Sequence, residues 1–170
     1  MLELRLPTLS DEGTFREAVA EFKANDPNFT FAFEFDEKAD FGIYLQRLQG
    51  WVEGKDLGDF VPNTFLVAVV RHKIVGRVSL RHELNDFLLR LGGHIGYGVV
   101  PSERRKGYAT EMLRQSLALA RNLGITRVLL TCDDDNEGSA RTIEAHCGIL
   151  ENKILQPGMS VAKRRYWIDL

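Results

Sequence analysis

The chain has 170 residues, enough for one domain with a sizeable core, and its hydrophobic share of 44% is ordinary for a globular protein. With 22 basic and 24 acidic residues, its formal net charge of −2 argues against a general nucleic-acid-binding protein. Two cysteines, Cys132 and Cys147, are too few for a disulfide framework and fit a reducing compartment.

The sequence contains neither a signal-peptide core nor a candidate membrane span. Charged residues interrupt the opening "MLELRLPTLSDEG", and no apolar stretch approaches the roughly 20 residues needed to cross a bilayer. There are no repeats, low-complexity tracts or linkers. We therefore expect residues 1–170 to form a single cytoplasmic domain.

The first third of the chain predicts one strand and two helices. "LELRLP" alternates apolar and charged residues, as a short strand does. Residues 10–24 open with "SDE", which suits a helix start, and then place apolar residues at helical spacing. A second amphipathic helix is predicted over residues 37–50, ending at Gly50.

The middle of the chain predicts an antiparallel pair followed by a strand–helix–strand unit. "NTFLVAVVRHKIVGRVSLRHEL" is typical of two antiparallel strands joined around residues 71–73. "GHIGYGVV", residues 93–100, predicts a strand that Pro101 ends, and the helix after it stops at Gly124. "ITRVLLTC" is a nearly continuous apolar run, as a buried strand is.

The last part predicts one more helix and a closing pair of strands. Asp135 or Asn136 can cap a helix that continues to about Cys147, and the strands are expected near 149–156 and 163–169. Residues 93–132 should then form a parallel, right-handed unit. An antiparallel meander leading into one crossover is not a doubly wound nucleotide-binding fold.

Residues 101–113, "PSERRKGYATEML", place Arg104, Arg105 and Lys106 at a helix start, where positive charge opposes the helix dipole. Gly107 lets a ligand approach the backbone closely, and the first amides of a helix have no intrahelical acceptors. Both features predict an anion site, most naturally for phosphate, with the cations as neutralisers. Solvated cations beside an ordinary turn would give the same pattern.

Other motifs for nucleotide, hydrolase or metal chemistry are missing from the sequence. "GWVEGKD" has the wrong spacing for a P-loop, "GYGVVP" ends in proline where a dinucleotide fingerprint needs glycine, and there is no G-x-S-x-G elbow. The four histidines show no ligand spacing with cysteines or carboxylates, so we assign no metal: His72, His82, His94 and His146.

"GYGVVPSERRKGYATEML" followed by "GITRVLLTCDDDNEGSARTIEAHCGI" resembles the GNAT superfamily of N-acetyltransferases over roughly residues 60–150. The family's first signature is Gln or Arg, two residues, Gly, one residue, then Gly or Ala. It matches here at Arg104, Gly107 and Ala109. The second signature, which follows the next strand, matches at Asn136, Ser139 and Gly148.

The resemblance implies an α/β protein of the mixed-sheet, α+β kind with a GNAT-like acetyltransferase fold. Such a fold has a central, mostly antiparallel sheet, one parallel splayed strand pair and flanking helices. The two helices expected before residue 60 fit the family's usual order of elements.

The resemblance also implies acetyl-coenzyme A as the acetyl donor. Its pyrophosphate would lie on the amides at the helix start, and its pantetheine arm would pair with the preceding strand and touch the helix after Asn136, although a plain helix cap explains Asn136 as well. The residues implied in binding are Val99, Val100, Arg104, Arg105, Lys106, Gly107, Tyr108, Ala109, Thr110, Asn136 and Ser139.

The catalytic groups are less sharply defined by the sequence. Many family members use a tyrosine on the last helix as general acid, and Glu144 stands at that position here. Tyr97 lies on the strand face that the family turns toward its ligands, so it is a candidate for substrate binding or proton transfer. His82 and Glu83, at the end of the preceding strand, are candidate bases.

The stretch "FTFAFEFDEKADF" falls in the family's variable region, which commonly walls the acceptor site. An extended segment would place its alternating phenylalanines on one side, beside Glu34 and Asp36. This pattern fits an acceptor that is a cationic amine with an apolar body. The simpler interpretation is a set of phenylalanines that pack under helices, with the acids in solvent.

The predicted function is therefore N-acetyl transfer from acetyl-CoA to a primary amine of a small molecule or peptide by direct attack. The alternative is a non-catalytic acetyl-CoA-binding module that regulates a partner. Neither nucleic acid nor a membrane is an expected partner. Homodimers are common in the family, so a homodimer is compatible with the resemblance.

Overall fold

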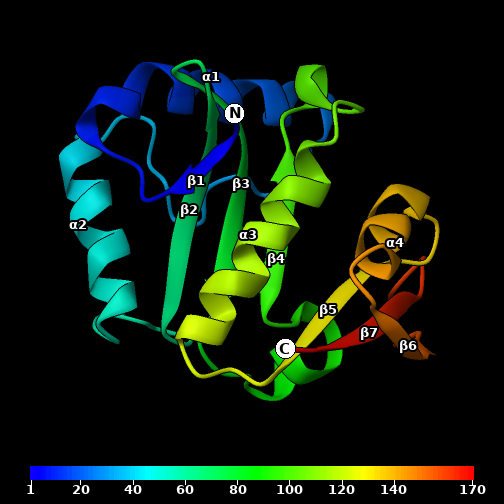
Figure 1. The fold of residues 1–170 in the computed structure, drawn as a ribbon. Helices are drawn as coiled ribbons and strands as arrows, with labels where there is room; N and C mark the ends of the chain where they lie inside the picture. The colour runs from blue at the N-terminus through cyan, green and yellow to red at the C-terminus, as the bar shows by residue number, and fades with distance from the viewer.

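The computed structural model describes residues 1–170 and divides the strands between two antiparallel sheets (Figure 1). The first sheet has the order β1-β2-β3-β4, and the second has the order β5-β7-β6. The strands are β1 Glu3–Arg5, β2 Asn63–Val70, β3 Lys73–Arg81, β4 Ile95–Val99, β5 Arg127–Asp133, β6 Ile149–Ile154 and β7 Lys163–Asp169.

Helices cover both faces of the first sheet. The four α-helices are α1 Glu12–Asn25, α2 Phe41–Val52, α3 Tyr108–Asn122 and α4 Glu137–Glu144. In Figure 1, α3 crosses the front of the sheet while α1 and α2 lie behind and beside it. Helix α4 packs instead beside the second sheet.

Two hydrophobic cores follow from this arrangement. Under α3, Met112 and Leu113 pack on Val78 and Leu80 of β3. Because side chains alternate along a strand, residues 77, 79 and 81 point to the other face. There an aromatic core gathers the side chains of α1, α2 and β2, including Phe15, Phe22, Phe41, Trp51 and Phe65.

The predicted elements are present, with shifts at two helix boundaries. Helix α2 begins at residue 41 because the Asp40 carboxylate caps it by accepting the Ile43 amide at 3.2 Å. It continues through Gly50, where the sequence predicted its end, to Val52. Helix α4 ends at Glu144 rather than near Cys147, which has a φ of +63°.

The prediction of an extended segment with all its phenylalanines on one side is wrong. Residues 26–40 form bends and turns. Phe31 and Phe35 pack edge-on against Phe15, with ring centroids 5.5 and 5.2 Å apart. Phe29 and Phe33 lie instead against β3, because the turns send alternate rings to different neighbours.

The expected splayed pair is formed by β4 and β5, which run in the same direction and diverge (Figure 1). They belong to different sheets and are joined only near their first residues. The His94 amide donates to the Leu129 carbonyl at 2.7 Å, and the Leu129 amide donates to Nδ1 of His94 at 2.9 Å. The strands therefore separate beyond this junction and leave a cleft between their carboxyl ends.

We predict that Gly93→Ala destabilises the fold by about 2–4 kcal/mol. Gly93 has a φ of +69°, and an added Cβ would lie 2.6 Å from the Leu129 carbonyl oxygen, so the substitution adds backbone strain to a clash with backbone. Denaturant unfolding measures the loss. Gly13→Ala is the matched control, because a Cβ there meets nothing within 4 Å; equal effects of the two changes would contradict the prediction.

Candidate active site

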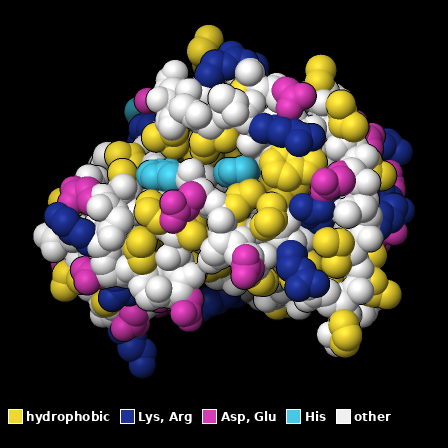
Figure 2. Space-filling model, turned by 90° about the horizontal axis from the view of Figure 1, so that it is seen from below, with side chains coloured by type: hydrophobic (Ala, Val, Ile, Leu, Met, Phe, Trp, Pro, Cys, Tyr) yellow, Lys and Arg dark blue, Asp and Glu magenta, His cyan; other side chains and the backbone are white.

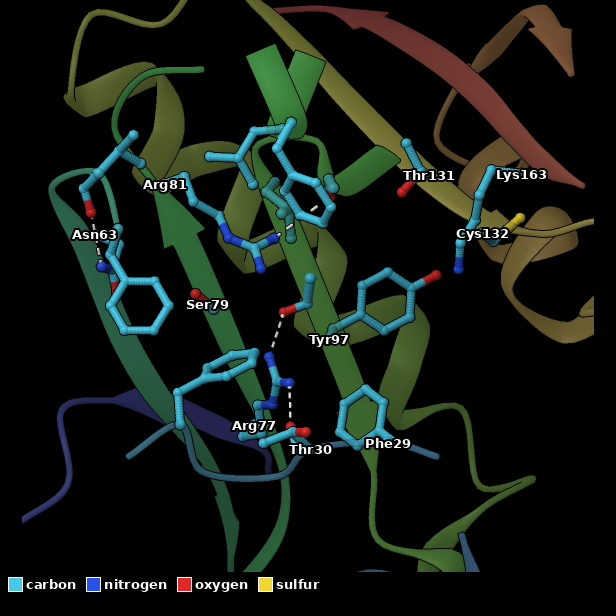
Figure 3. A pocket seen from close by; sticks show the side chains of 18 of the residues that line it. Phe29, Thr30, Asn63, Arg77, Ser79, Arg81, Tyr97, Thr131, Cys132 and Lys163 are labelled. Atoms are coloured by element: carbon cyan, nitrogen blue, oxygen red, sulfur yellow. Dashed lines mark hydrogen bonds between the residues drawn. The ribbon is translucent and has the colours of Figure 1, made fainter. Parts of the chain in front are cut away.

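A cavity of about 860 Å³ lies along β3 and β4 and reaches across to β5 and the start of α4. Figure 3 shows side chains from these elements converging on it. Part of the cavity wall is aromatic and is formed by Phe29, Phe33 and Phe60. Polar groups of the sheet, including Arg77 and Arg81, line another part. The cavity combines a broad apolar surface with a few directed polar groups, as ligand pockets do.

Backbone amides without acceptors surround the turn before α3. None of the amides of residues 105–110 donates a hydrogen bond within the chain. Gly107 caps the helix with a φ of +79°, and a Cβ there would meet nothing within 4 Å. Arg105 also has a positive φ, +68°. The turn is therefore an open concavity of amides at the positive end of a helix, which is suited to an anion.

The cations at this turn are partly neutralised by carboxylates of the chain itself. Arg104 contacts Asp26 at 2.6 Å, and Lys106 contacts Glu103 at 2.7 Å. Arg105 is exposed and makes no hydrogen bond or ion pair. These ion pairs resolve the unfavourable placement of positive charge at a helix start. They are solvent-exposed and weak, so an incoming anion can compete with them.

A hydrogen bond between two residues of the cavity wall joins β4 to α4. The Tyr97 hydroxyl and Ser139 Oγ are 2.9 Å apart, and Cys132 lines the same part of the cavity. Asn136 caps α4 by accepting the Ser139 amide at 3.0 Å. The structure thus brings together Tyr97, Asn136 and Ser139, which the sequence analysis selected from separate elements.

Burial keeps the two weak acids at this point protonated. It raises the pKa of Tyr97 to about 12, although the hydrogen bond from Ser139 acts in the opposite direction. It likewise raises the pKa of Cys132 to about 11. Near neutral pH the tyrosine is therefore a proton donor and cannot act as a base.

Other candidate residues lie outside the cavity. His82 Nε2 is 2.8 Å from the Thr64 hydroxyl, and burial lowers the pKa of this histidine. Glu83 is exposed. Glu144 is also exposed and accepts a hydrogen bond from the Tyr166 hydroxyl at 2.8 Å. The catalytic roles expected of these residues stay predictions.

The two valines predicted to meet the pantetheine differ in what their backbone offers. The Val100 amide donates to Val75 at 2.9 Å and its carbonyl accepts from Glu103 at 2.8 Å, so neither group is free. The Val99 carbonyl accepts only from the Arg104 side chain, at 3.2 Å. Val99 is therefore the better placed of the pair.

The cavity is also lined by polar residues of β3, which the sequence analysis did not select. Arg77, Ser79 and Arg81 alternate along the strand and share the face that α1 and α2 cover. The signal was present in "RVSLR", where polar residues recur every second position. A strand with one polar stripe amid buried neighbours indicates a lined cavity rather than plain core.

The structure shows no metal site or membrane-spanning helix. No group of three or more His, Cys, Asp or Glu side chains is arranged to hold a metal ion. None of the helices has the length and apolar character that spanning a bilayer requires.

On the face seen in Figure 2, charged side chains of both signs are scattered among hydrophobic and uncharged ones.

Comparison with known proteins identifies relatives of this arrangement. The family model described as the acetyltransferase (GNAT) domain matches residues 1–148. No curated protein sequence matches the chain. Many solved structures share the fold.

Three of the solved structures illustrate the range of similar proteins. The microcin C7 self-immunity acetyltransferase MccE, in complex with acetyl-CoA and AMP, is 18% identical with a TM-score of 0.71, over 99% of this chain and 92% of that one. YncA from Salmonella typhimurium, described as a putative acetyltransferase with its cofactor acetyl-CoA, is 14% identical with a TM-score of 0.65, over 99% of this chain and 93% of that one. The ribosomal-protein-S5-alanine acetyltransferase from Vibrio fischeri is 18% identical with a TM-score of 0.66, over 99% and 92%. At these identities the likeness is one of fold.

We predict that the junction at His94 weakens in acid. Burial, with a smaller effect from the Arg81 charge, lowers the pKa of His94 from 6.5 to about 4. Between these pH values His94 is protonated in the unfolded chain but neutral in the folded chain. About 3 kcal/mol of stability is therefore lost as pH falls from about 6.5 to 4. Full stability from this residue is present above pH 6.5.

His94→Asn tests this, because an amide oxygen can accept the Leu129 amide without titrating. The pH dependence of the free energy of unfolding between pH 4 and 6.5 should flatten in this variant. His72→Asn, at an exposed turn where φ is +64°, should leave the dependence unchanged. An unchanged slope in His94→Asn would contradict the assignment.

Proposed function

Because the chain belongs to the GNAT acetyltransferase family, we propose that it is an acetyl-CoA-dependent N-acetyltransferase. The acceptor is a primary amine of a small molecule or peptide, which attacks the thioester directly. The observation that carries the proposal is the run of amides over residues 105–110 without acceptors, which follows β4, one of the two parting strands. Acetyl-CoA in the structures of MccE and YncA supports the same cosubstrate here.

In this proposal the pyrophosphate lies on the amides of residues 105–110, which need an acceptor and face open space at Gly107. Arg104 and Lys106 exchange their carboxylate partners for phosphate oxygens, and Arg105 has no partner to lose. Thr110 adds a hydroxyl. Charge-assisted bonds of this kind are about twice as strong as neutral ones.

The pantetheine arm then runs down the cleft between β4 and β5. Its amides pair with the backbone at Val99, and Asn136 and Ser139 meet its other side. The arm ends near Tyr97, where the junction of His94 with Leu129 closes the cleft. This closed end fixes how deep the acetyl group can sit.

The reaction joins the amine nitrogen to the thioester carbonyl carbon and breaks the carbon–sulfur bond, so the thiolate must gain a proton and the amine must lose one. Tyr97 suits the first transfer, because its hydroxyl is buried in the cleft and its pKa of about 12 keeps it protonated. It would take the role that a tyrosine at the position of Glu144 has elsewhere in the family.

Proton loss by the amine is the more demanding step. A lysine-like amine of pKa near 10.4 is neutral in about one molecule in 2,500 at pH 7, a handicap of roughly 4.6 kcal/mol. An α-amino group of pKa near 8 needs only about 1.4 kcal/mol. His82 and Glu83 do not line the cavity, so either could accept this proton only through water.

We predict that Gly107→Ala weakens acetyl-CoA binding at least tenfold. The new methyl group would project into the space that the phosphates need, and the αL backbone would be strained. Gly124→Ala is a matched control at the other end of α3: it has the same φ of +79° and also meets nothing within 4 Å. Titration calorimetry should separate the two variants; no heat with the wild-type chain would end the proposal.

We predict that Tyr97→Phe lowers kcat by about 100-fold while the Kd of acetyl-CoA changes little. General-acid catalysis contributes roughly 10²–10⁴-fold, and a thiol of pKa near 8.5 leaves with modest help, so the low end applies. Glu144→Gln serves as the comparison, since its carboxylate contacts only Tyr166. A kcat unchanged in Tyr97→Phe would remove Tyr97 from the mechanism.

Turnover also separates the enzyme from the alternative, a coenzyme-binding module that regulates a partner. Such a module would bind acetyl-CoA with the same dependence on Gly107. It would release no coenzyme A thiol with any amine.

A further inference from the structure

Two arginines of β3 meet the cavity without a carboxylate partner. Arg77 and Arg81 lie on one face of the strand with Ser79 between them, as Figure 3 shows. In the β3–β4 register Arg77 is opposite Gly98 and Ser79 is opposite Gly96. The glycines add no side chains on β4, so the arginines border the cavity. Neither arginine takes part in an ion pair.

Arg77 is almost completely enclosed, with an exposed fraction of 3%. Its guanidinium lies 4.5 Å from the centre of the Phe29 ring and 5.1 Å from that of Phe33. It donates to the Thr30 carbonyl at 2.6 Å and to the Gly96 carbonyl at 3.3 Å, while Nε has no partner. Burial, with a smaller effect from the nearby Arg81 charge, lowers the pKa of Arg77 to about 9.

Arg81 is held even less completely. The one hydrogen bond of its side chain is donated to the Gly92 carbonyl at 3.5 Å. Its guanidinium lies over Gly96, where an added Cβ would be 2.9 Å from Nη1. Burial lowers the pKa of Arg81 to about 10. The side chain is therefore a half-buried cation with most of its donors unused.

The acidic residues of the cavity do not balance these charges. Asp133 is 2.6 Å from Lys163 and forms its ion pair there. Asp59 is exposed and makes no ion pair. The Trp51 indole nitrogen is a further buried donor without an acceptor. The cavity thus has an excess of positive charge and of hydrogen-bond donors, in a chain whose net charge is −2.

Buried cations are normally paired, because a charge without a partner in a low-dielectric site is strongly destabilising. A ligand that carries acceptors would supply the missing partner. Guanidinium groups match the planar or tetrahedral oxygens of carboxylate and phosphate, which can bridge two donors. The acidic residues expected to attract a cationic acceptor do not reach the cavity: Glu34 is 3.7 Å from Arg47, and Asp36 accepts the Lys38 amide.

We propose that the acetyl acceptor is an amine that also carries an oxyanionic group, a carboxylate or a phosphate, and that Arg77 and Arg81 bind this group. The inference rests on the proposed function, because it concerns the substrate of that same site. Ser79 lies between the two arginines, opposite Gly96, and so borders the path between the oxyanion and the thioester end of the cleft.

Binding is tested directly by following the arginine Nε–H signals of the wild-type chain by NMR, with coenzyme A present in excess. The coenzyme fills the diphosphate site at α3, so a further anion cannot act there. The probes are matched pairs: free α-amino acids against their amides, and O-phosphoethanolamine against ethanolamine. The first member of at least one pair should shift the Arg77 and Arg81 signals, which the arginine variants assign, and the uncharged member should not.

The kinetic test uses the same pairs. The preferred oxyanionic amine should exceed its uncharged partner in kcat/KM by about 10- to 100-fold, the range expected for charge-assisted bonds. Arg81→Gln should abolish most of this preference through KM, by lowering kcat/KM for the oxyanionic amine far more than for its uncharged partner. Arg77→Lys keeps the positive charge but loses the paired donors of the guanidinium, so it should reduce the preference by less. Arg121→Gln, an exposed position on α3, is the matched control.

Each result bears on one of the two proposals. If uncharged amines are acetylated as well as their oxyanionic partners, or if no oxyanionic amine moves the arginine signals, the oxyanion site is wrong and acetyl transfer stands. If acetyl-CoA itself gives no heat of binding, the proposed function fails first. Preference for carboxylate over phosphate, or the reverse, identifies which oxyanion the cavity takes.

Discussion

The site depends on one short junction between β4 and β5. His94 satisfies both backbone groups of Leu129, one with its own amide and one with its imidazole Nδ1. The His94 side chain therefore accepts a hydrogen bond that a backbone carbonyl would accept in a regular parallel ladder. Because the junction is short, the strands are fixed at one end and free to separate at the other. Residues of both strands and of the start of α4 therefore line a cavity.

Several hydrogen-bonding groups near the separated strands have no partner, and all of them are donors. The turn before α3 offers unused amides, and the cavity along β3 offers unused guanidinium and indole donors. Although the net charge of the chain is −2, unpaired donors lie at both places where we propose that ligands bind, the turn before α3 and the cavity along β3. Both places need negative oxygens, but of different molecules: a diphosphate at the helix and, in our proposal, the oxyanion of the acceptor at the strand.

Much of the first anion site could be predicted from the sequence, because its parts are neighbours in the chain. The glycine, the flanking cations and the helix that follows lie within "ERRKGYAT", and the amides belong to the backbone of that segment. The cap at Asn136 was equally local. The contact of Tyr97 with Ser139 joins residues that the sequence analysis had selected separately, but their meeting depends on how β4 and α4 pack.

The sequence by itself determined the order of strands and helices, because hydrophobic periodicity and turn residues act over a few positions. It also determined the turn of unpaired amides that we propose binds phosphate, for the same reason. Only the tertiary structure decided which groups face the acceptor. In our proposal Arg77 and Arg81 form a site because the turns of residues 26–40 lay Phe29 and Phe33 against β3 and because neither arginine has a carboxylate partner. Such balances of charge depend on segments distant in sequence, so no local pattern encodes them.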